Sequence, residues 1–443
     1  MKKELIGIFV CILFIVTSIP ISGQITKNIL IKNYDEINPS NNYDKWIRIF
    51  GGDAPDWGNY AKETSDGGFI VGGITHSFGD ENGDIWLIKT DNKGNLIWDG
   101  YFGGIFDDFC SDVQETSDGG FIITGYNDTY DKFTQFTLIK VNSDGELIWE
   151  KSFGDIQQDC GLNVRELDDG GYISLGFADF DYNVWQSDIW LIKVDNDGNF
   201  IWDKKFGDEG NFQGRSFDIT DSGDFIIAGL CNISGVIDDY YLWIIKTDNK
   251  GEIIWDRTYY NDIYSHGRLD IQQTADGGYI IVGNIDFNSS VCNIWLLKID
   301  SDGEILWEKI FSDFAPYQEA YAIRETFDGG YIIAGKTCCN GYDSDVLIIK
   351  TDNQGELLWV NNKELKGGQG IYSVEQTKDG GYIFAGSLGK GWLNSDICDL
   401  WLIKADSNGD YPTNRPRNLM HLMIFDLFPN LFPIFKRIIQ ILV

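Results

Sequence analysis

Residues 87–98 read LIKTDNKGNLIW, and close variants of this phrase recur along the chain. The copies are LIKVNSDGELIW (138–149), LIKVDNDGNFIW (191–202), IIKTDNKGEIIW (244–255), LLKIDSDGEILW (296–307) and IIKTDNQGELLW (348–359). A seventh copy, LIKADSNGDY (402–411), ends before the tryptophan. One phrase repeated at a fixed period is typical of repeat architectures, so this repeat decides the fold.

A second phrase, Asp-Gly-Gly followed by an aromatic residue and Ile, marks the same repeat. It begins at Asp66, Asp118, Asp169, Asp276, Asp328 and Asp379, and a degraded copy begins at Asp221. The intervals are 52, 51, 52, 55, 52 and 51 residues. Seven units of one size therefore follow each other without a gap.

Within a unit the apolar residues alternate with period two. The segments 330–337, 345–352 and 305–311 are rich in Ile, Val and aromatic residues and are too short for helices; with 320–326 they define four strands, A to D. Glycines in the A–B and C–D turns supply the positive φ of a tight hairpin. The pattern predicts an all-β fold, a seven-bladed β-propeller of four-stranded antiparallel blades over residues 44–410.

The missing tryptophan indicates how the ring closes. Trp46 precedes the first Asp-Gly-Gly by 20 residues, as Trp98 and Trp149 precede theirs. The N-terminal strand 44–50 is therefore predicted to supply strand D of the last blade and to pair with residues 398–405.

The Asp-x-x-Gly-x-x-x-Trp phrase resembles the tryptophan-docking repeat of pyrroloquinoline-quinone (PQQ) type propellers. The whole region 44–410 resembles uncharacterised secreted repeat proteins of prokaryotes. The resemblance implies a propeller, and it suggests the alternative that the protein is an enzyme with PQQ as its cofactor. Cys338 and Cys339 support this alternative, because an adjacent-cysteine disulfide lies over the cofactor in some quinoproteins.

Tight A–B and C–D turns share one face of a propeller, so the longer B–C and D–A connections share the other, here called the variable face. Binding is expected there. Aromatic residues that the repeat does not require are predicted as ligand-binding residues of this face: Trp57, Trp185, Trp392, Tyr130, Tyr182, Tyr240, Tyr264 and Tyr342. Aromatic faces among Asp and Asn suit sugar rings, although each residue alone also fits a role in packing loops onto blades.

The charged residues that recur in each repeat are expected to have a structural and not a catalytic role. One lysine per blade is expected to pair with strand-A acids such as Glu63, Glu115 and Glu325. The strand C–D turns lack the further ligands of a calcium loop, so acidic pairs on the variable face, such as Asp107 with Asp108, are the better cation candidates. No metal ligands or catalytic residues can be assigned, and no cofactor is required; calcium and PQQ stay open.

The cysteines that follow residues 1–23 all map to the variable face. They are Cys110, Cys160, Cys231, Cys292, Cys338, Cys339 and Cys398. Bridges between adjacent blades are the hypothesis: Cys110 with Cys160, Cys231 with Cys292, and Cys398 with Cys338 or Cys339. The connectivity cannot be fixed from sequence, and Cys338 and Cys339 could also join each other.

The chain ends differ from the repeat. Residues 1–23 have the basic start and apolar stretch of a signal peptide, which predicts a secreted or cell-surface protein. Residues 24–43 are expected to be a linker. Residues 411–443 form an apolar tail, interrupted by charges and prolines, that could be an association segment, a poor membrane anchor or the product of a frameshift. Membrane association is expected only through these terminal segments.

A net charge of −33 argues against nucleic acid as a partner. The prediction is a monomeric, exported, non-enzymatic binding or adhesion module that recognises extracellular glycan or protein through the variable face. The alternative is a quinoprotein-like oxidoreductase or a carbohydrate-active enzyme on the same scaffold. An enzyme is the less favoured reading because the sequence shows no catalytic constellation.

Overall fold

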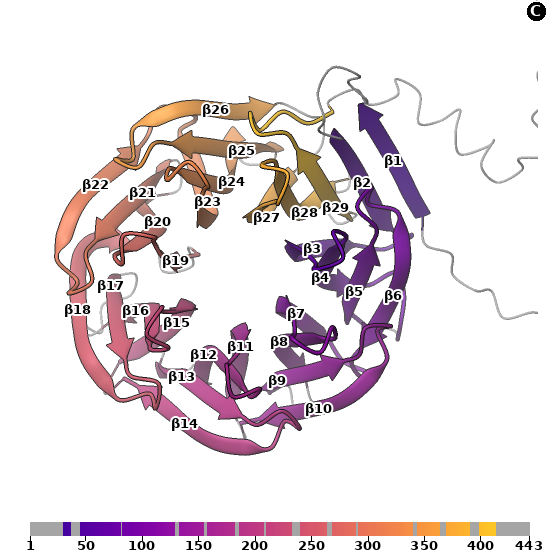
Figure 1. The fold of residues 1–443 in the computed structure, drawn as a ribbon, viewed down its shortest axis with the longest axis horizontal. Helices are drawn as coiled ribbons and strands as arrows, with labels where there is room; N and C mark the ends of the chain where they lie inside the picture. Colours follow the sequence, from indigo (N-terminus) through magenta and orange to yellow (C-terminus); the bar gives the residue numbers. More distant parts are fainter. Residues whose placement is uncertain are drawn as a thin grey trace, which may run out of the picture.

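The computed structural model is all-β in the residues it describes, and their four-stranded antiparallel units surround a common axis (Figure 1). The described residues are 30–36, 45–80, 82–128, 133–154, 157–181, 186–207, 210–232, 240–263, 268–288, 291–339, 343–363, 369–389 and 398–412. Within these residues, no helix is long and apolar enough to cross a membrane. The fold is propeller-like, as the repeat predicts.

The four strands of each unit follow the predicted order A to D from the axis outward (Figure 1). The inner strands, A, are β3 (Asp56–Glu63), β7 (Asp108–Glu115), β11 (Gln158–Glu166), β15 (Asn211–Ile219), β19 (Asp270–Gln273), β23 (Tyr317–Glu325) and β27 (Gln369–Gln376). The B strands are β4 (Phe69–Thr75), β8 (Phe121–Asp128), β12 (Tyr172–Asp181), β16 (Phe225–Asn232), β20 (Tyr279–Asn288), β24 (Tyr331–Cys339) and β28 (Tyr382–Gly389).

The C strands are β5 (Asp84–Thr90), β9 (Thr134–Val141), β13 (Gln186–Val194), β17 (Tyr240–Thr247), β21 (Val291–Ile299), β25 (Asp343–Thr351) and β29 (Cys398–Ala405). The outer strands, D, are β6 (Leu96–Phe102), β10 (Leu147–Phe153), β14 (Phe200–Phe206), β18 (Ile253–Ile263), β22 (Ile305–Phe311), β26 (Leu357–Lys363) and β2 (Lys45–Gly51). We number the units 1 to 6 from β3–β6 to β23–β26. The terminal unit combines β27, β28 and β29 with β2.

The terminal unit joins the two ends of the described chain. β2 pairs with β29 in antiparallel register from Trp46 opposite Lys404 to Phe50 opposite Leu400. The predicted pairing of the N-terminal strand with residues 398–405 is therefore confirmed. A further strand, β1 (Leu30–Glu36), pairs with the outer edge of β2 and lies inside the segment that the sequence suggested was a linker.

Glycine and tryptophan of the repeated phrase meet between units, not within one. Gly94, in the C–D turn of unit 1, has φ of +74°, and a Cβ added to it would lie 2.7 Å from the ring of Trp46 in the terminal unit. The same contact joins each later glycine to the tryptophan of the unit before it: Gly145 to Trp98, Gly198 to Trp149, Gly251 to Trp202, Gly303 to Trp255, Gly355 to Trp307 and Gly409 to Trp359. Glycine is therefore required twice, by the turn and by the ring beneath it.

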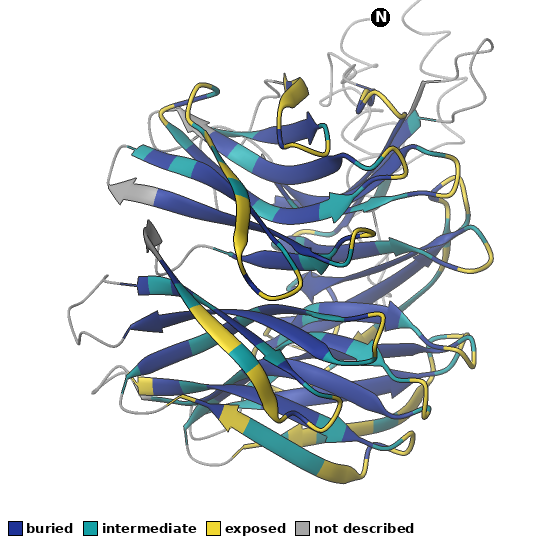
Figure 2. Cartoon of the chain, turned by 60° about the vertical axis from the view of Figure 1, so that its left-hand side comes forward, coloured by how far each residue is buried: buried dark blue, intermediate teal, exposed yellow. Residues whose placement is uncertain are grey.

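The hydrophobic core lies between the units, because the central strands of each sheet are buried on both faces (Figure 2). Alternate residues of β4 show this. Phe69 and Val71 pack in one cluster with Leu400 of the terminal unit, whereas Ile70 packs in another with Phe121 of unit 2. Side chains of a strand alternate between its faces, so each central strand contributes to two cores.

The repeated lysines have a structural role, as expected, but their partners differ from the prediction. Lys140 lies 3.0 Å from Asp118, the aspartate of the Asp-Gly-Gly turn in its own unit, and Lys298 lies 2.9 Å from Asp276 in the same way. The pairs Lys89–Asp66, Lys193–Asp169, Lys350–Asp328 and Lys404–Asp379 repeat this contact. In unit 4 the positive φ of Gly223 shows that Ser222, not Asp221, occupies the aspartate position.

The strand-A acids instead accept hydrogen bonds from the neighbouring unit. The Glu115 carboxylate accepts from the backbone N–H of Ser65 at 2.7 Å. Glu325 accepts from Ala275 at 2.8 Å, and Glu63 accepts from Lys378 at 2.7 Å. Each acid thus satisfies an orphan donor in the A–B turn of the preceding unit and ties the two units together.

The predicted disulfides Cys110–Cys160 and Cys231–Cys292 are not formed, so this part of the prediction is wrong. Cys110 and Cys160 occupy β7 and β11, the inner strands of successive units, and both are buried free thiols. The Cys110 thiol packs on Gly72 of unit 1, on the side of its sheet away from β11, so it does not point toward Cys160 as a disulfide requires. Cys398 is buried, and the side chains of Cys338 and Cys339 lie outside the described residues.

Trp46→Ala tests the contact between the ends of the chain. Trp46 is 2% exposed and packs edge-to-face on Phe69 in addition to Gly94. Losing a buried aromatic side chain should lower the free energy of unfolding by about 3–5 kcal/mol, measured by urea denaturation. The control is Ile97→Ala, because Ile97 on outer strand β6 is 55% exposed and should change stability by less than about 0.5 kcal/mol. Equal stabilities of the two variants would contradict this role.

Candidate functional site

Inner strands carry a β-bulge at the same place in most units. In β3 the register with β4 shifts between Gly58 and Tyr60, which makes Asn59 the extra residue. The corresponding bulged residues of β7, β11, β15, β23 and β27 are Ser111, Leu162, Arg215, Tyr321 and Tyr372. A bulge bends the strand and re-aims a side chain. The residue at this position differs from unit to unit, so the fold presents different chemistry at each point around the axis.

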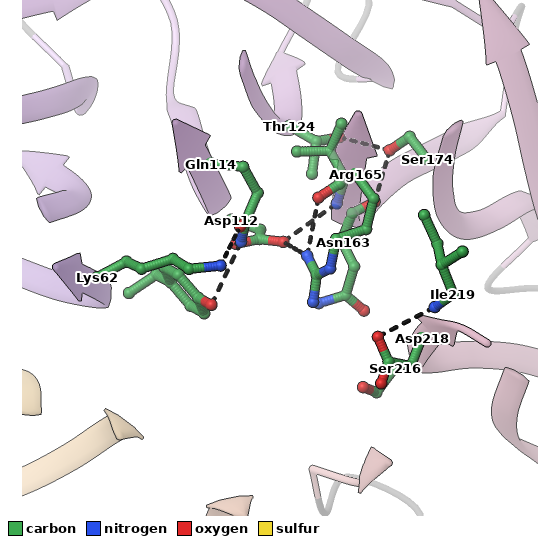
Figure 3. Close-up of polar contacts among 12 residues, drawn as sticks. Lys62, Asp112, Gln114, Thr124, Asn163, Arg165, Ser174, Ser216, Asp218 and Ile219 are labelled. Carbon is green, nitrogen blue, oxygen red and sulfur yellow. Dashed lines mark hydrogen bonds and ion pairs between the residues drawn. The ribbon is translucent and has the colours of Figure 1, made fainter. Parts of the chain in front are cut away.

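Polar residues that follow the bulge link neighbouring inner strands (Figure 3). Asp112 of β7 accepts hydrogen bonds from the backbone N–H of Val164 at 3.1 Å and from the guanidinium of Arg165 at 2.6 Å, both on β11. Asp270 binds β23 in the same way, through Ile323 N–H at 2.9 Å and Arg324 at 2.6 Å. These aspartates therefore act as clamps between adjacent units.

Residues from three units meet in this layer. Arg324 also donates to Glu375 of β27 at 2.8 Å, and Glu375 accepts a hydrogen bond from the Tyr60 hydroxyl of β3 at 3.0 Å. Burial alone would raise the pKa of Glu375, but the charges of Arg324 and Lys62 and these hydrogen bonds hold it below its usual value. Burial raises the pKa of Tyr60. The layer thus holds fixed charges and is better suited to rigidity than to proton transfer.

A second cluster, the Arg268 cluster, lies nearer the starts of the inner strands, and hence toward the variable face. Its residues are Arg268, Tyr321, Tyr372, Glu319 and Lys336. The Arg268 guanidinium carbon lies 5.5 Å from the ring centroid of Tyr321 and 5.3 Å from that of Tyr372. Because these residues come from units 5 and 6 and the terminal unit, their contact places the cluster at the axis.

The aromatic rings of the cluster are held in place. Tyr321 and Tyr372 pack edge-to-face with centroids 5.2 Å apart, and the Tyr321 hydroxyl donates to Glu319. Glu319 also accepts from the Tyr317 hydroxyl and pairs with Lys336 at 3.1 Å. Arg268, Tyr321 and Tyr372 are all half-buried, so they combine fixed geometry with access to solvent.

Arg215, the bulged residue of unit 4, extends the cluster. Burial, together with the like charge of Arg268, lowers the pKa of Arg215 to about 10, while Tyr240 acts in the opposite direction. The two guanidinium groups and Tyr240 therefore lie close enough to interact electrostatically. Arg215 and Arg268 thus bring two positive charges to one end of the axis.

The structure describes two of the eight predicted ligand-binding aromatics. Tyr240 is buried at the start of β17 beside Arg215, and Trp57 is half-buried on β3, where its ring packs edge-to-face on His76 at 5.3 Å. Trp185, Trp392, Tyr130, Tyr182, Tyr264 and Tyr342 lie outside the described residues. The sequence reasoning missed Arg215, Arg268, Tyr321 and Tyr372. Aligning the seven A strands would have brought Arg215, Tyr321 and Tyr372 to one aligned position and Arg268 to the position before it.

Acidic residues on the variable face also approach each other between units 1 and 2. A Cβ added to Gly103 would touch both Asp108 Oδ2 and Asp84 Oδ1, and Asp108 Oδ1 has no hydrogen-bond partner in the described part of the chain. Burial, with the nearby charges of Asp84 and Glu150, raises the pKa of Asp108 to about 7. Among described residues, no group of three or more metal-ligating side chains comes together.

Comparison with solved structures gives fold-level similarity. A polysaccharide lyase described as an ulvan lyase matches with a TM-score of 0.53 and 10% sequence identity, covering 84% of this chain and 98% of that one. The BP39L lectin from Burkholderia pseudomallei matches with a TM-score of 0.53 and 8% identity, covering 80% and 97% of the two chains. No family model matches, and no curated protein matches. At these identities the similarity shows the fold alone.

Asp108→Asn tests the electrostatics of the Asp84–Asp108 pair. A carboxylate whose pKa rises from about 3.9 unfolded to about 7 folded makes the wild type lose stability as the pH rises from about 4 to 7. The variant lacks this loss, so its advantage should grow over that range and reach about 1–3 kcal/mol at pH 8, measured by urea denaturation.

The matched control is Asp144→Asn, which removes an exposed turn carboxylate of the same unit. Identical pH profiles for Asp108→Asn and wild type would contradict the buried-pair interpretation. Calcium titration at pH 8 tests whether the Asp84–Asp108 pair binds a cation. A cation that neutralises the pair should stabilise the wild type and not Asp108→Asn.

Proposed function

We propose that the chain is an exported, seven-bladed propeller that binds glycan without catalysis, through the axial end carrying the Arg268 cluster. The seven glycine–tryptophan contacts run in cyclic order from Trp46–Gly94 to Trp359–Gly409 and support both the blade count and the closure. The β2–β29 pairing supports the same closed ring. Blades joined in a ring leave the two axial ends as the places where all units can contribute to one ligand.

The observation that carries the proposal is the convergence of Tyr321, Tyr372 and Arg268 from three units on one half-buried, rigid cluster. Aromatic rings stack on the CH faces of sugars, and fixed polar groups beside them bind hydroxyls. Holding the rings in advance lowers the entropy lost on binding. Trp57, half-buried on the same face, extends the surface that a longer glycan would cover.

The fold comparisons are compatible with this proposal, since a lectin and a polysaccharide lyase share the propeller-like architecture. They do not separate binding from catalysis, because a fold hosts many functions. A carbohydrate-active enzyme is the second candidate, favoured by Glu319 in the cluster. Lys336 and the hydroxyls of Tyr317 and Tyr321 outweigh burial and lower the pKa of Glu319, so this carboxylate is ionised and could act as a base but not as an acid.

Tyr372→Ala tests glycan binding. Neutral and acidic polysaccharides are screened on an array, and hits are measured by isothermal titration calorimetry with the purified protein. Loss of one stacking platform should weaken binding at least tenfold, or about 1.4 kcal/mol. The matched control is Phe327→Ala, because Phe327 is an exposed aromatic residue of an A–B turn on the opposite face. A wild-type protein that binds no glycan would overturn the proposal, and turnover of a bound glycan would favour the enzyme.

A further inference from the structure

The arrangement of charge in the Arg268 cluster specifies the kind of glycan. Resting on the proposed function, we infer that the axial site selects sugars carrying an anionic substituent, a carboxylate or a sulfate ester, and that Arg268 recognises this group. The inference concerns specificity, because aromatic stacking alone would accept neutral and acidic sugars alike.

The contacts of Arg268 leave its hydrogen-bonding edge suited to an anion. In the part of the chain that the structure describes, its guanidinium contacts two aromatic rings and no carboxylate. The N–H groups of a guanidinium lie in its own plane, where they match the paired oxygens of a carboxylate or sulfate. The two tyrosines thus hold the Arg268 guanidinium through ring contacts and not through a carboxylate that would occupy its N–H groups.

Neighbouring charges favour the same ligand. Glu319 is matched by Lys336 at 3.1 Å, so this pair does not offset Arg268. Arg215 of the adjacent unit donates to the side chain of Gln213 at 2.5 Å, and the charge of Arg268 is among the causes of the lowered pKa of Arg215. An anion bound to Arg268 would offset this like charge.

This local charge opposes that of the whole molecule. The axial layer below the cluster is close to balanced, because Arg165, Arg324 and Lys62 face Asp112, Asp270, Glu375 and Asp218. Most of the acidic excess that gives −33 overall therefore lies elsewhere on the chain. At physiological salt the Debye length is about 8 Å, so peripheral carboxylates are screened while a direct guanidinium contact is not. Short acidic oligosaccharides should bind more readily than long polyanions.

Pairs of ligands that have the same sugar backbone but differ in charge separate the effect of charge on binding from the effect of sugar shape. Isothermal titration calorimetry uses oligogalacturonate and its neutral methyl ester for the carboxylate arm, and a carrageenan oligosaccharide with its desulfated form for the sulfate arm. Wild-type protein should bind the anionic member of at least one pair at least tenfold more tightly. Arg268→Gln should remove the difference. Arg268→Lys should restore part of it, because lysine keeps the charge but not the paired donors.

The control Lys309→Gln makes the same change of charge at an exposed pair with Glu356 on an outer strand and should leave the preference intact. Equal binding of the neutral and anionic members by wild type would overturn this inference and leave the proposed function standing. Absence of binding to any glycan would overturn both. If Arg268→Gln weakened the two members equally, Arg268 would act only by supporting the tyrosines, and the inference would also be wrong.

Discussion

The contact between the glycine of one C–D turn and the tryptophan of the preceding unit is the constraint on which the rest of the structure depends. The Gly94 position has positive φ and a tryptophan ring directly beneath it, so any side chain there would both strain the turn and displace Trp46. The contact fixes the spacing and tilt of one sheet against the next. Because the buried core lies between sheets, correct stacking is also what creates the core.

This constraint explains why the sequence predicts the fold so well. Asp, Gly and Trp of the phrase are local in sequence and visible by inspection, and their partners follow from counting units. The absence of a tryptophan after residue 411 and its presence at Trp46 predicted the pairing of β2 with β29, which the register of Trp46 with Lys404 confirms. A strict repeat makes non-local contacts readable, because each contact is made many times.

Side-chain pairing was less predictable, and the lysines show why. A lysine on strand C could reach an acid on strand A or one in the A–B turn, and both residue types repeat in every unit. The structure selects the turn aspartate, as in Lys140 with Asp118, and leaves Glu115 to accept from the turn of unit 1. The disulfide prediction failed for a related reason: Cys110 and Cys160 are neighbours in the repeat, but the Cys110 thiol faces Gly72 of unit 1 and not the unit that carries Cys160.

The residues of the candidate site lie in a different part of the fold from the one that the sequence analysis searched. Searching for aromatics outside the repeat led to loops, whereas Tyr321 and Tyr372 of the Arg268 cluster are bulged residues of inner strands, and Arg268 directly precedes such a strand. A bulged residue is released from the alternation that buries its neighbours, so it can vary without disturbing the core. The clamp formed by Asp270, Arg324 and Glu375 lies a few residues further along these strands and holds them in position. Clamping residues and solvent-accessible residues thus follow each other along one strand, and this is how a scaffold under strict repetition can still present a specific surface at its axis.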